Sequence, residues 1–220
     1  MDTFERDRRA KMDALRAEGI DSFSGPTHPP TPIDVVRAKF DATKNKEDGA
    51  LFAVAGRVAL KRGQGKLSFI TLTSDTGKIQ LALDVSHLSP RAQKTAKGID
   101  LGDVISAFGN LCSTKTGEVT IWVRELYICG KALTPPPDKH NGLSDPELRY
   151  RNRHVDMWTN PQTMAVLQAR SKIMRSIRNF MHEQGYLEVE TPMMQPVAGG
   201  AAAKPFKTHH NALDIDLYMR

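Results

Sequence analysis

Five short apolar segments between Leu51 and Cys129 constrain the fold of this chain more than any other feature. They are rich in Val, Ile, Leu and Phe, are separated by Gly or Asp turns, and cover residues 51–61, 67–73, 78–84, 103–112 and 119–129. A segment without strand character, Leu88–Lys97, follows the third. Three strands, a helical link and two more strands are the order of a small five-stranded OB-fold β-barrel. A generic Greek-key sandwich has a similar strand count and stays an alternative.

Changes of composition predict four regions and an α+β class overall. They are an N-terminal helical extension (1–48) with helices over 3–18 and 33–46, the barrel (49–133), a Pro-rich linker (134–160) and an incomplete second domain (161–220). In the second domain, Pro161 opens a long helix with apolar residues every three or four positions, and Gly185 ends it. Tyr186–Thr191 is predicted to form a short strand that Pro192 stops.

Composition excludes some classes of protein and favours others. No apolar run reaches the ~20 residues that span a bilayer, and the N-terminus lacks the apolar core of a secretory signal. The two cysteines, Cys112 and Cys129, show no metal-ligand spacing, which favours buried thiols in a reducing compartment, the cytoplasm. The net charge of +6 suits a polyanionic partner such as RNA, although many proteins of similar charge bind no nucleic acid.

Alternation along the first three strands predicts which residues face outward. Val54 and Val58, with Phe52 and Leu60, share one apolar face of the first strand, and Ile70 with Leu72 and Ile79 with Leu81 and Leu83 do the same in the next two. Because side chains alternate across a strand, we expect Arg57, Phe69 and Gln80 on the outer face.

A cation, an aromatic ring and an amide on one face suit single-stranded RNA. A base can stack on Phe69, Gln80 can read a base edge, and Arg57 can bind a phosphate. The alternative is that Phe69 covers a gap against a neighbouring domain, while Arg57 and Gln80 are solvated.

Three motifs strengthen the RNA interpretation. Val54-Ala55-Gly56-Arg57, Lys66-Leu67-Ser68-Phe69 and Lys78-Ile79-Gln80 resemble the anticodon-binding barrel of class IIb aminoacyl-tRNA synthetases, the lysyl, aspartyl and asparaginyl group. The resemblance implies that Arg57, Phe69 and Gln80 contact the anticodon, with Gln80 at the central uridine. It also implies a contact from Glu118 in the hairpin between the fourth and fifth strands. The alternative is that Glu118 is only a charged residue at the tip of a turn.

The C-terminal motifs resemble the start of a class II catalytic domain. Glu190-Thr191-Pro192 is similar to motif 1, and the resemblance implies that Pro192 lies at a homodimer interface. Two further stretches resemble lysyl enzymes specifically: Gly199-Gly200-Ala201-Ala202-Ala203-Lys204-Pro205-Phe206 and Thr208-His209-His210-Asn211-Ala212-Leu213-Asp214. In that family the second glycine lines the lysine pocket, which implies this role for Gly200.

The resemblance implies a lysine–tRNA ligase, which uses ATP with Mg²⁺ to make lysyl-adenylate and transfers lysine to tRNA(Lys). Family members continue beyond the position of Arg220 into motifs 2 and 3, so we expect no catalytic residue and no metal ligand here and no activity from these 220 residues alone. Adjacent His209 and His210 point apart in an extended chain, which argues against zinc. The alternatives are a non-catalytic tRNA-binding OB module and an unstable gene fragment without function.

Overall fold

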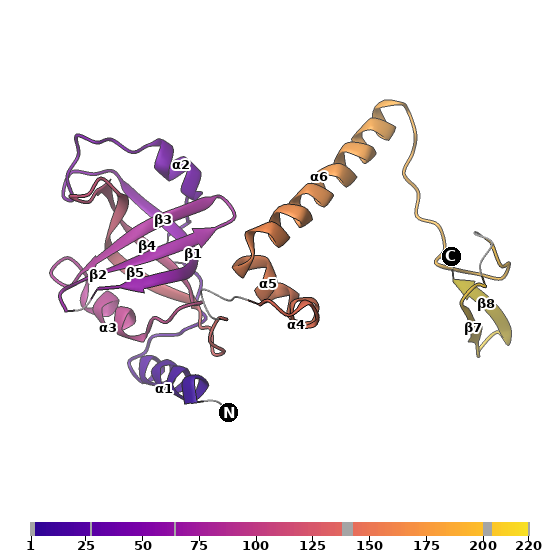
Figure 1. Cartoon of the computed structure of the whole chain (residues 1–220), viewed down its shortest axis with the longest axis horizontal. Coiled ribbons are helices and arrows are strands. Elements are labelled where there is room, and N and C mark those ends of the chain that lie inside the picture. Colours follow the sequence, from indigo (N-terminus) through magenta and orange to yellow (C-terminus); the bar gives the residue numbers. More distant parts are fainter. Residues whose placement is uncertain (1–2, 27, 64, 138–142, 200–203, 220) are drawn as a thin grey trace. The chain divides into compact units, whose positions relative to one another are not determined.

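The computed structural model describes residues 3–26, 28–63, 65–137, 143–199 and 204–219. The chain divides into two units, Met1–Gly142 and Leu143–Arg220, each of which is described by itself (Figure 1). The predicted boundaries at residues 49, 134 and 161 stay predictions. In the described residues, no helix is long and apolar enough to cross a membrane.

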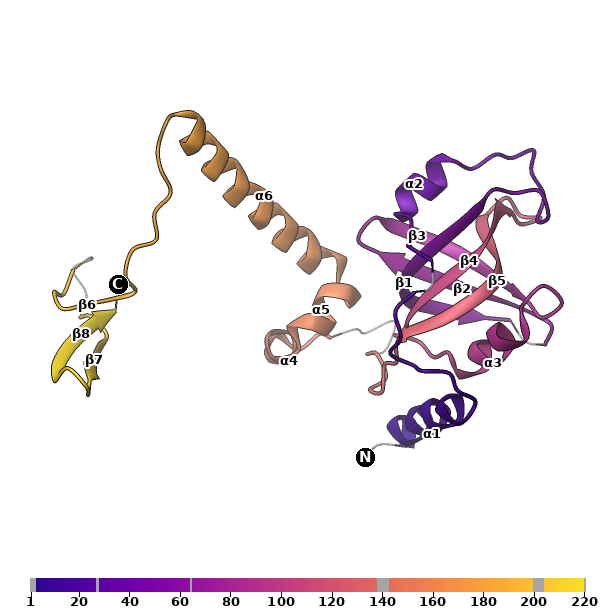
Figure 2. The same cartoon turned by 180° about the vertical axis from the view of Figure 1, so that it is seen from behind.

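The first unit is built around a closed five-stranded barrel (Figures 1 and 2). Its strands are β1 (Leu51–Arg62), β2 (Leu67–Ser74), β3 (Gly77–Asp84), β4 (Val104–Ser113) and β5 (Val119–Gly130). They pair in the order β1-β2-β3-β5-β4, and β1 closes the ring against β4. All five strands lie within about one residue of the predicted segments, and the closure is that of the predicted OB-fold barrel rather than of an open sandwich.

The helical link after the third strand is α3 (Pro90–Gly98), whose N-terminus is capped by a side chain. The Ser89 hydroxyl accepts a hydrogen bond from the Ala92 amide, and Pro90 occupies the first turn, where its missing N–H costs nothing. At the other end, Lys61 Nζ donates to the Ala96 and Ile99 carbonyls at 3.2 and 2.9 Å. A cation at a helix C-terminus is also favoured by the helix dipole.

The N-terminal extension packs on this link. Helix α1 (Thr3–Ala17) contacts α3, where Leu15 lies so close to Gly98 that an added Cβ would meet its Cδ1 at 2.5 Å. Helix α2 (Ile33–Ala38) is shorter than the predicted 33–46. The prediction was wrong beyond Ala38 because Asp41 accepts hydrogen bonds from the Thr43 amide and hydroxyl, a turn that competes with the helix.

A β-bulge in β1 changes which side chains face outward. Val58 pairs with Leu72, but Leu60 pairs with Thr71, so Ala59 is an extra residue in the ladder. Every side chain after it is therefore moved to the opposite face relative to a simple count of two. The prediction that Leu60 faces the core was wrong: it lies half-buried on the outer face.

The second unit begins with three helices, α4 (Pro146–Arg151), α5 (Arg153–Thr159) and α6 (Pro161–Glu183). The buried Asp156 carboxylate joins them, since it accepts hydrogen bonds from Arg149 (2.8 Å), Arg153 (2.9 Å) and Thr163 (3.0 Å). Burial alone would raise the pKa of Asp156, but the hydrogen bonds from Arg149 and Thr163 hold this pKa below its usual value. Helix α6 has the predicted start at Pro161, and Gly185 follows its end at φ +83°.

Beyond α6, the chain forms a small antiparallel sheet in the order β6-β8-β7. Its strands are β6 (Met194–Gln195), β7 (Lys207–His210) and β8 (Ile215–Met219). The predicted strand at Tyr186–Thr191 was wrong: these residues are exposed and have no ladder among the described residues. An apolar alternating segment becomes a strand only where another strand accepts its hydrogen bonds.

Candidate nucleic-acid interface

The outer face of β1, β2 and β3 carries the three residues predicted to meet RNA. The register places Arg57 opposite Thr73 and Gln80 opposite Thr71, on the same side of β2 as Phe69. The alternate side chains are fully buried in the barrel: Val54, Val58, Ile70, Leu72, Ile79 and Leu81. The register therefore agrees with the predicted parity of these three residues, while their role in binding is a proposal.

Gln80 has a fixed position on this face. Its side-chain oxygen accepts a hydrogen bond from Arg62 Nη2 at 2.9 Å, and its nitrogen lies 3.1 Å from Thr120 Oγ1. Thr120 in turn donates to the Glu118 carbonyl at 2.9 Å. Arginine has no acceptor, so the Gln80 oxygen must face it and the amide nitrogen must donate to Thr120. The chain of hydrogen bonds therefore runs in one direction and sets the orientation of the amide.

The hydrogen bonds to Arg62 and Thr120 use one acceptor position and one donor hydrogen of the Gln80 amide, and the amide has one more of each. The nitrogen has a second hydrogen and the oxygen a second lone pair. Such a pair is complementary to the N3–H and O4 of uracil. The geometry therefore suits the recognition of an unpaired base edge.

The cation nearest to Phe69 is Arg62, which the sequence argument missed. Arg62 lies directly opposite Phe69 in the ladder. A count of two from Arg57 places Arg62 toward the core, and only the bulge at Ala59 turns it outward. The sequence does show two adjacent cations, Lys61 and Arg62, before Gly63. It does not show which of them faces outward.

Arg57 lies at the far end of the same face. Its partner Thr73 is four residues along β2 from Phe69, a distance of about 13 Å. Arg57 Nη1 donates to the Gly102 carbonyl at 2.7 Å. Burial lowers the pKa of this arginine, and the Asp103 charge works in the opposite direction. Arg57 thus borders the face rather than touching Phe69.

Glu118 lies in the hairpin that connects β4 and β5. The Thr114 hydroxyl accepts from the Glu118 amide, and Gly117 adopts φ +83° to make the tight turn. The carboxylate is about half exposed and lies 4.0 Å from Arg37 Nη1. The turn thus holds the Glu118 backbone beside Thr120 and leaves the side chain accessible to solvent.

The predicted residues of the second unit are less defined by geometry. Pro192 is exposed in the segment between α6 and β6, and Gly200 lies outside the described residues. His209 pairs with Asp216 (3.1 Å) and Asp214 (3.3 Å). Among the residues that the structure describes, no three His, Cys, Asp or Glu side chains gather to hold a metal ion.

Burial raises the pKa of both free thiols, Cys112 and Cys129.

Comparisons with known proteins match both halves of the chain. Residues 52–128 match the family model of the OB-fold nucleic acid binding domain (tRNA anti-codon), and residues 145–220 match that of the class II tRNA synthetases (D, K and N). The lysine–tRNA ligases of Syntrophomonas wolfei and Serratia proteamaculans are 42% and 46% identical to it, each over 97% of this chain. The chain is thus similar to class II lysyl-tRNA synthetases over most of its length. A further relative, the lysine–tRNA ligase of Moorella thermoacetica, is 41% identical over 97% of the chain.

The matched models describe the barrel as an OB-fold nucleic acid binding domain and residues 145–220 as part of a class II tRNA synthetase. The chain spans less than half of the length of these curated relatives, 42–43%. The activity, substrates and partners of the whole relatives can therefore only be proposed for this chain.

Proposed function

We propose that these residues form the anticodon-binding and motif 1 portion of a lysine–tRNA ligase. The enzyme would activate lysine with ATP to lysyl-adenylate and transfer it to tRNA(Lys), in the cytoplasm where protein synthesis takes place. The observation that carries the proposal is the oriented Arg62–Gln80–Thr120 chain beside Phe69, on an OB-fold barrel of a chain similar to lysine–tRNA ligases.

In this proposal Phe69 stacks one anticodon base, and Gln80 hydrogen-bonds the central uridine. Arg57 and Glu118 contact the ends of the loop. Because Gln80 is already held in place before RNA binds, binding loses less side-chain conformational entropy. Gly200 would line the lysine pocket. ATP would be a substrate of the whole enzyme and Mg²⁺ its metal cofactor, and we assign none of their ligands to the residues described here.

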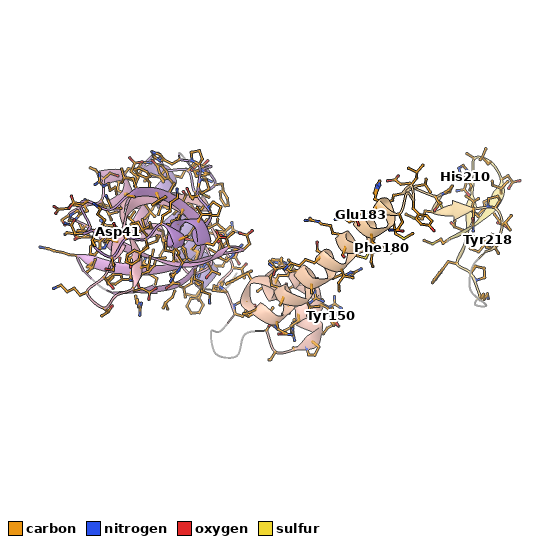
Figure 3. All side chains as sticks on the ribbon, turned by 90° about the horizontal axis from the view of Figure 1, so that it is seen from above. Asp41, Tyr150, Phe180, Glu183, His210 and Tyr218 are labelled. Carbon is orange, nitrogen blue, oxygen red and sulfur yellow. The ribbon has the colours of Figure 1, made fainter. Side chains whose placement is uncertain are left out.

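A second part of the proposal is a homodimer through motif 1. Helix α6 exposes an apolar stripe with spacings of seven, four and three residues: Val166, Ile173, Ile177 and Phe180, each 52–59% exposed (Figure 3 labels Phe180). These spacings place the four side chains on one face of the helix. An apolar stripe of this kind on a soluble chain supports burial against a partner, and Pro192 would lie at the edge of that contact.

Binding of the 220-residue chain to a tRNA(Lys) anticodon stem-loop tests the first part. Phe69→Ala is expected to weaken binding by ~1–3 kcal/mol, because the base loses its stacking surface. Fluorescence anisotropy with a labelled stem-loop measures the dissociation constants at fixed salt.

The matched control for that substitution is Phe108→Ala. Phe108 lies on β4, and its ring is already stacked on His28 at 4.2 Å between centroids. The folded control should bind RNA like the parent. Equal affinity of the Phe69 variant and the parent would remove Phe69 from the interface.

A further inference from the structure

A second aromatic ring is aligned with Phe69 on the barrel surface. Phe69 pairs with Ala82, and Ala82 pairs with Trp122 on β5. Paired residues of neighbouring strands face the same side, so the two rings share the outer face with only a methyl group between them. Two strand spacings, about 10 Å, separate the backbones that carry them. Neither composition nor motif singled out Trp122.

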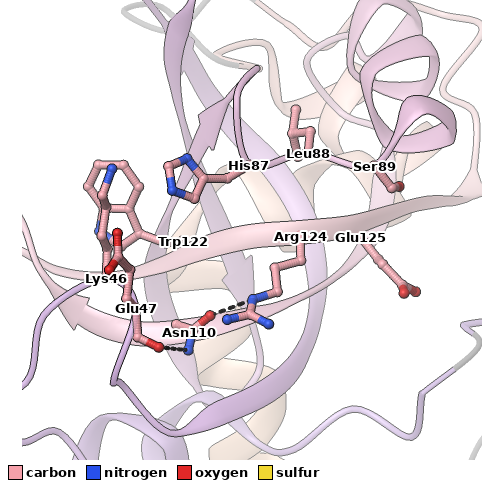
Figure 4. Close-up of a pocket in the computed structure, with 9 residues that line it drawn as sticks. All are labelled: Lys46, Glu47, His87, Leu88, Ser89, Asn110, Trp122, Arg124 and Glu125. Carbon is pink, nitrogen blue, oxygen red and sulfur yellow. Dashed lines mark hydrogen bonds between the residues drawn. The ribbon is translucent and has the colours of Figure 1, made fainter.

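Trp122 borders a surface cavity of about 360 Å³ whose lining includes two cations and two carboxylates (Figure 4). Lys46 Nζ lies 5.4 Å from the centroid of the Trp122 ring, within the range of a cation–π contact. Arg124 and His87 also line the cavity. The lining carboxylates are Glu47 and Glu125, of which Glu125 accepts a hydrogen bond from the Tyr127 hydroxyl at 2.5 Å.

The positions of Arg124 and Lys46 both depend on one buried amide side chain, that of Asn110. Asn110 is 3% exposed and lies opposite Trp122 in the ladder. Its oxygen accepts from Arg124 Nε at 2.7 Å, and its nitrogen donates to the Gly49 carbonyl at 2.7 Å, as Figure 4 shows in part. The first bond orients the guanidinium and leaves the η nitrogens for a ligand; the second anchors the loop that carries Lys46.

We propose that the Trp122 cavity is a second nucleotide subsite, in which a base of the RNA loop stacks on Trp122 and its phosphates meet Lys46 and Arg124. The inference rests on the proposed RNA-binding function of the barrel. The base is a different one from that on Phe69, because the two rings are too far apart to sandwich a single base. When RNA binds, the Lys46 ammonium leaves the ring for a phosphate, and the base takes its place.

The test uses the 220-residue chain and tRNA(Lys) anticodon stem-loops in which one loop nucleotide at a time is abasic. Trp122→Leu is expected to weaken binding to the intact stem-loop by about 5- to 150-fold. Trp122→Phe keeps a π face and should lose less than about fivefold. One abasic position should weaken the parent but not the Trp122→Leu variant further, and this position should differ from the one coupled to Phe69.

Two controls separate failure of the subsite from failure of the proposed function. Phe108→Leu makes the same kind of change on a ring that His28 already covers, and it should bind like the parent. If Phe69→Ala weakens binding while Trp122→Leu does not, the subsite is wrong and the proposed function stands. If neither changes the affinity, the proposed function fails.

A spectroscopic readout covers the case in which Trp122→Leu does not fold. The chain has two tryptophans, so Trp158→Phe leaves Trp122 as the single reporter. Stacking of a base should quench its fluorescence in step with binding, and saturation without quenching would overturn the subsite. Lys46→Ala should reduce the magnitude of the slope of log affinity against log salt by about 0.7, the value for one phosphate contact. An unchanged slope would show that Lys46 does not contact a phosphate.

Discussion

Gln80 illustrates how a residue on an outer face can still be fixed before it meets a ligand. It is only 7% exposed although it points away from the core, because Arg62 and Thr120 lie on either side of it. A buried amide held by a donor on its oxygen and an acceptor on its nitrogen has one orientation, whereas a solvated amide has two of similar energy. In the proposed interface, discrimination between bases would therefore depend on Arg62 as much as on Gln80.

Arg62→Met tests this dependence. The Gln80 oxygen loses its donor, so the amide can rotate, and the preference for uridine over cytidine at the centre of the anticodon should fall. The ratio of the two stem-loop dissociation constants measures it. Gln80→Ala should lower the same ratio, and the double variant should lose no more, with a coupling energy of about 1 kcal/mol. Additive losses would show that Arg62 acts only through its charge.

At the scale of elements, the corner between α3 and β4 is held by buried charges. Lys131, the residue that follows β5, donates to the Gly98 carbonyl (2.7 Å), Asp100 (2.6 Å) and Asp103 (2.8 Å). Lys11 of α1 contacts the other Asp100 oxygen at 2.5 Å. Burial by itself would raise the pKa of Asp100, but these two lysines more than offset it and hold that pKa below its usual value.

A depressed pKa makes a definite contribution to acid stability. Asp100 stabilises the fold above its unfolded pKa of about 3.9, and this contribution is lost as pH falls through the lower folded pKa. Asp100→Asn should therefore reduce stability near neutral pH by about 1–3 kcal/mol and flatten the acid side of the profile. Thermal unfolding between about pH 6 and pH 3 measures both effects.

The control is Asp75→Asn, which removes one carboxylate from the exposed turn between β2 and β3. Its profile should follow that of the parent. An Asp100 variant with the parent's acid slope would contradict the role of the Lys131 cluster.

At the scale of the whole molecule, the apolar core lies in the first unit. Every buried hydrophobic side chain of the described residues falls between Leu15 and Ile128. Among the described residues of the second unit, only Asp156 and Thr163 are buried, and both are polar. Burial of apolar area is the main source of stability, so the two units should differ strongly in their resistance to unfolding.

Limited proteolysis tests this difference. A brief digestion should cut first in the exposed segment between residues 184 and 193 and leave a fragment that contains the barrel. Mass spectrometry of the products locates the cuts. Cleavage within residues 51–130 at the same rate would contradict the expectation. Protection of α6 that rises with protein concentration would support the proposed dimer.

The strand positions, the core residues and the start of α6 were predictable because alternation, turn residues and helix caps are local patterns. Phe69 and Gln80 could be placed on the outer face for the same reason. The outward turn of Arg62, the alignment of Phe69 with Trp122 and the failure of Tyr186–Thr191 to form a strand were not predictable. Each depends on which residue of a distant strand lies opposite, and that register is settled only when the barrel closes.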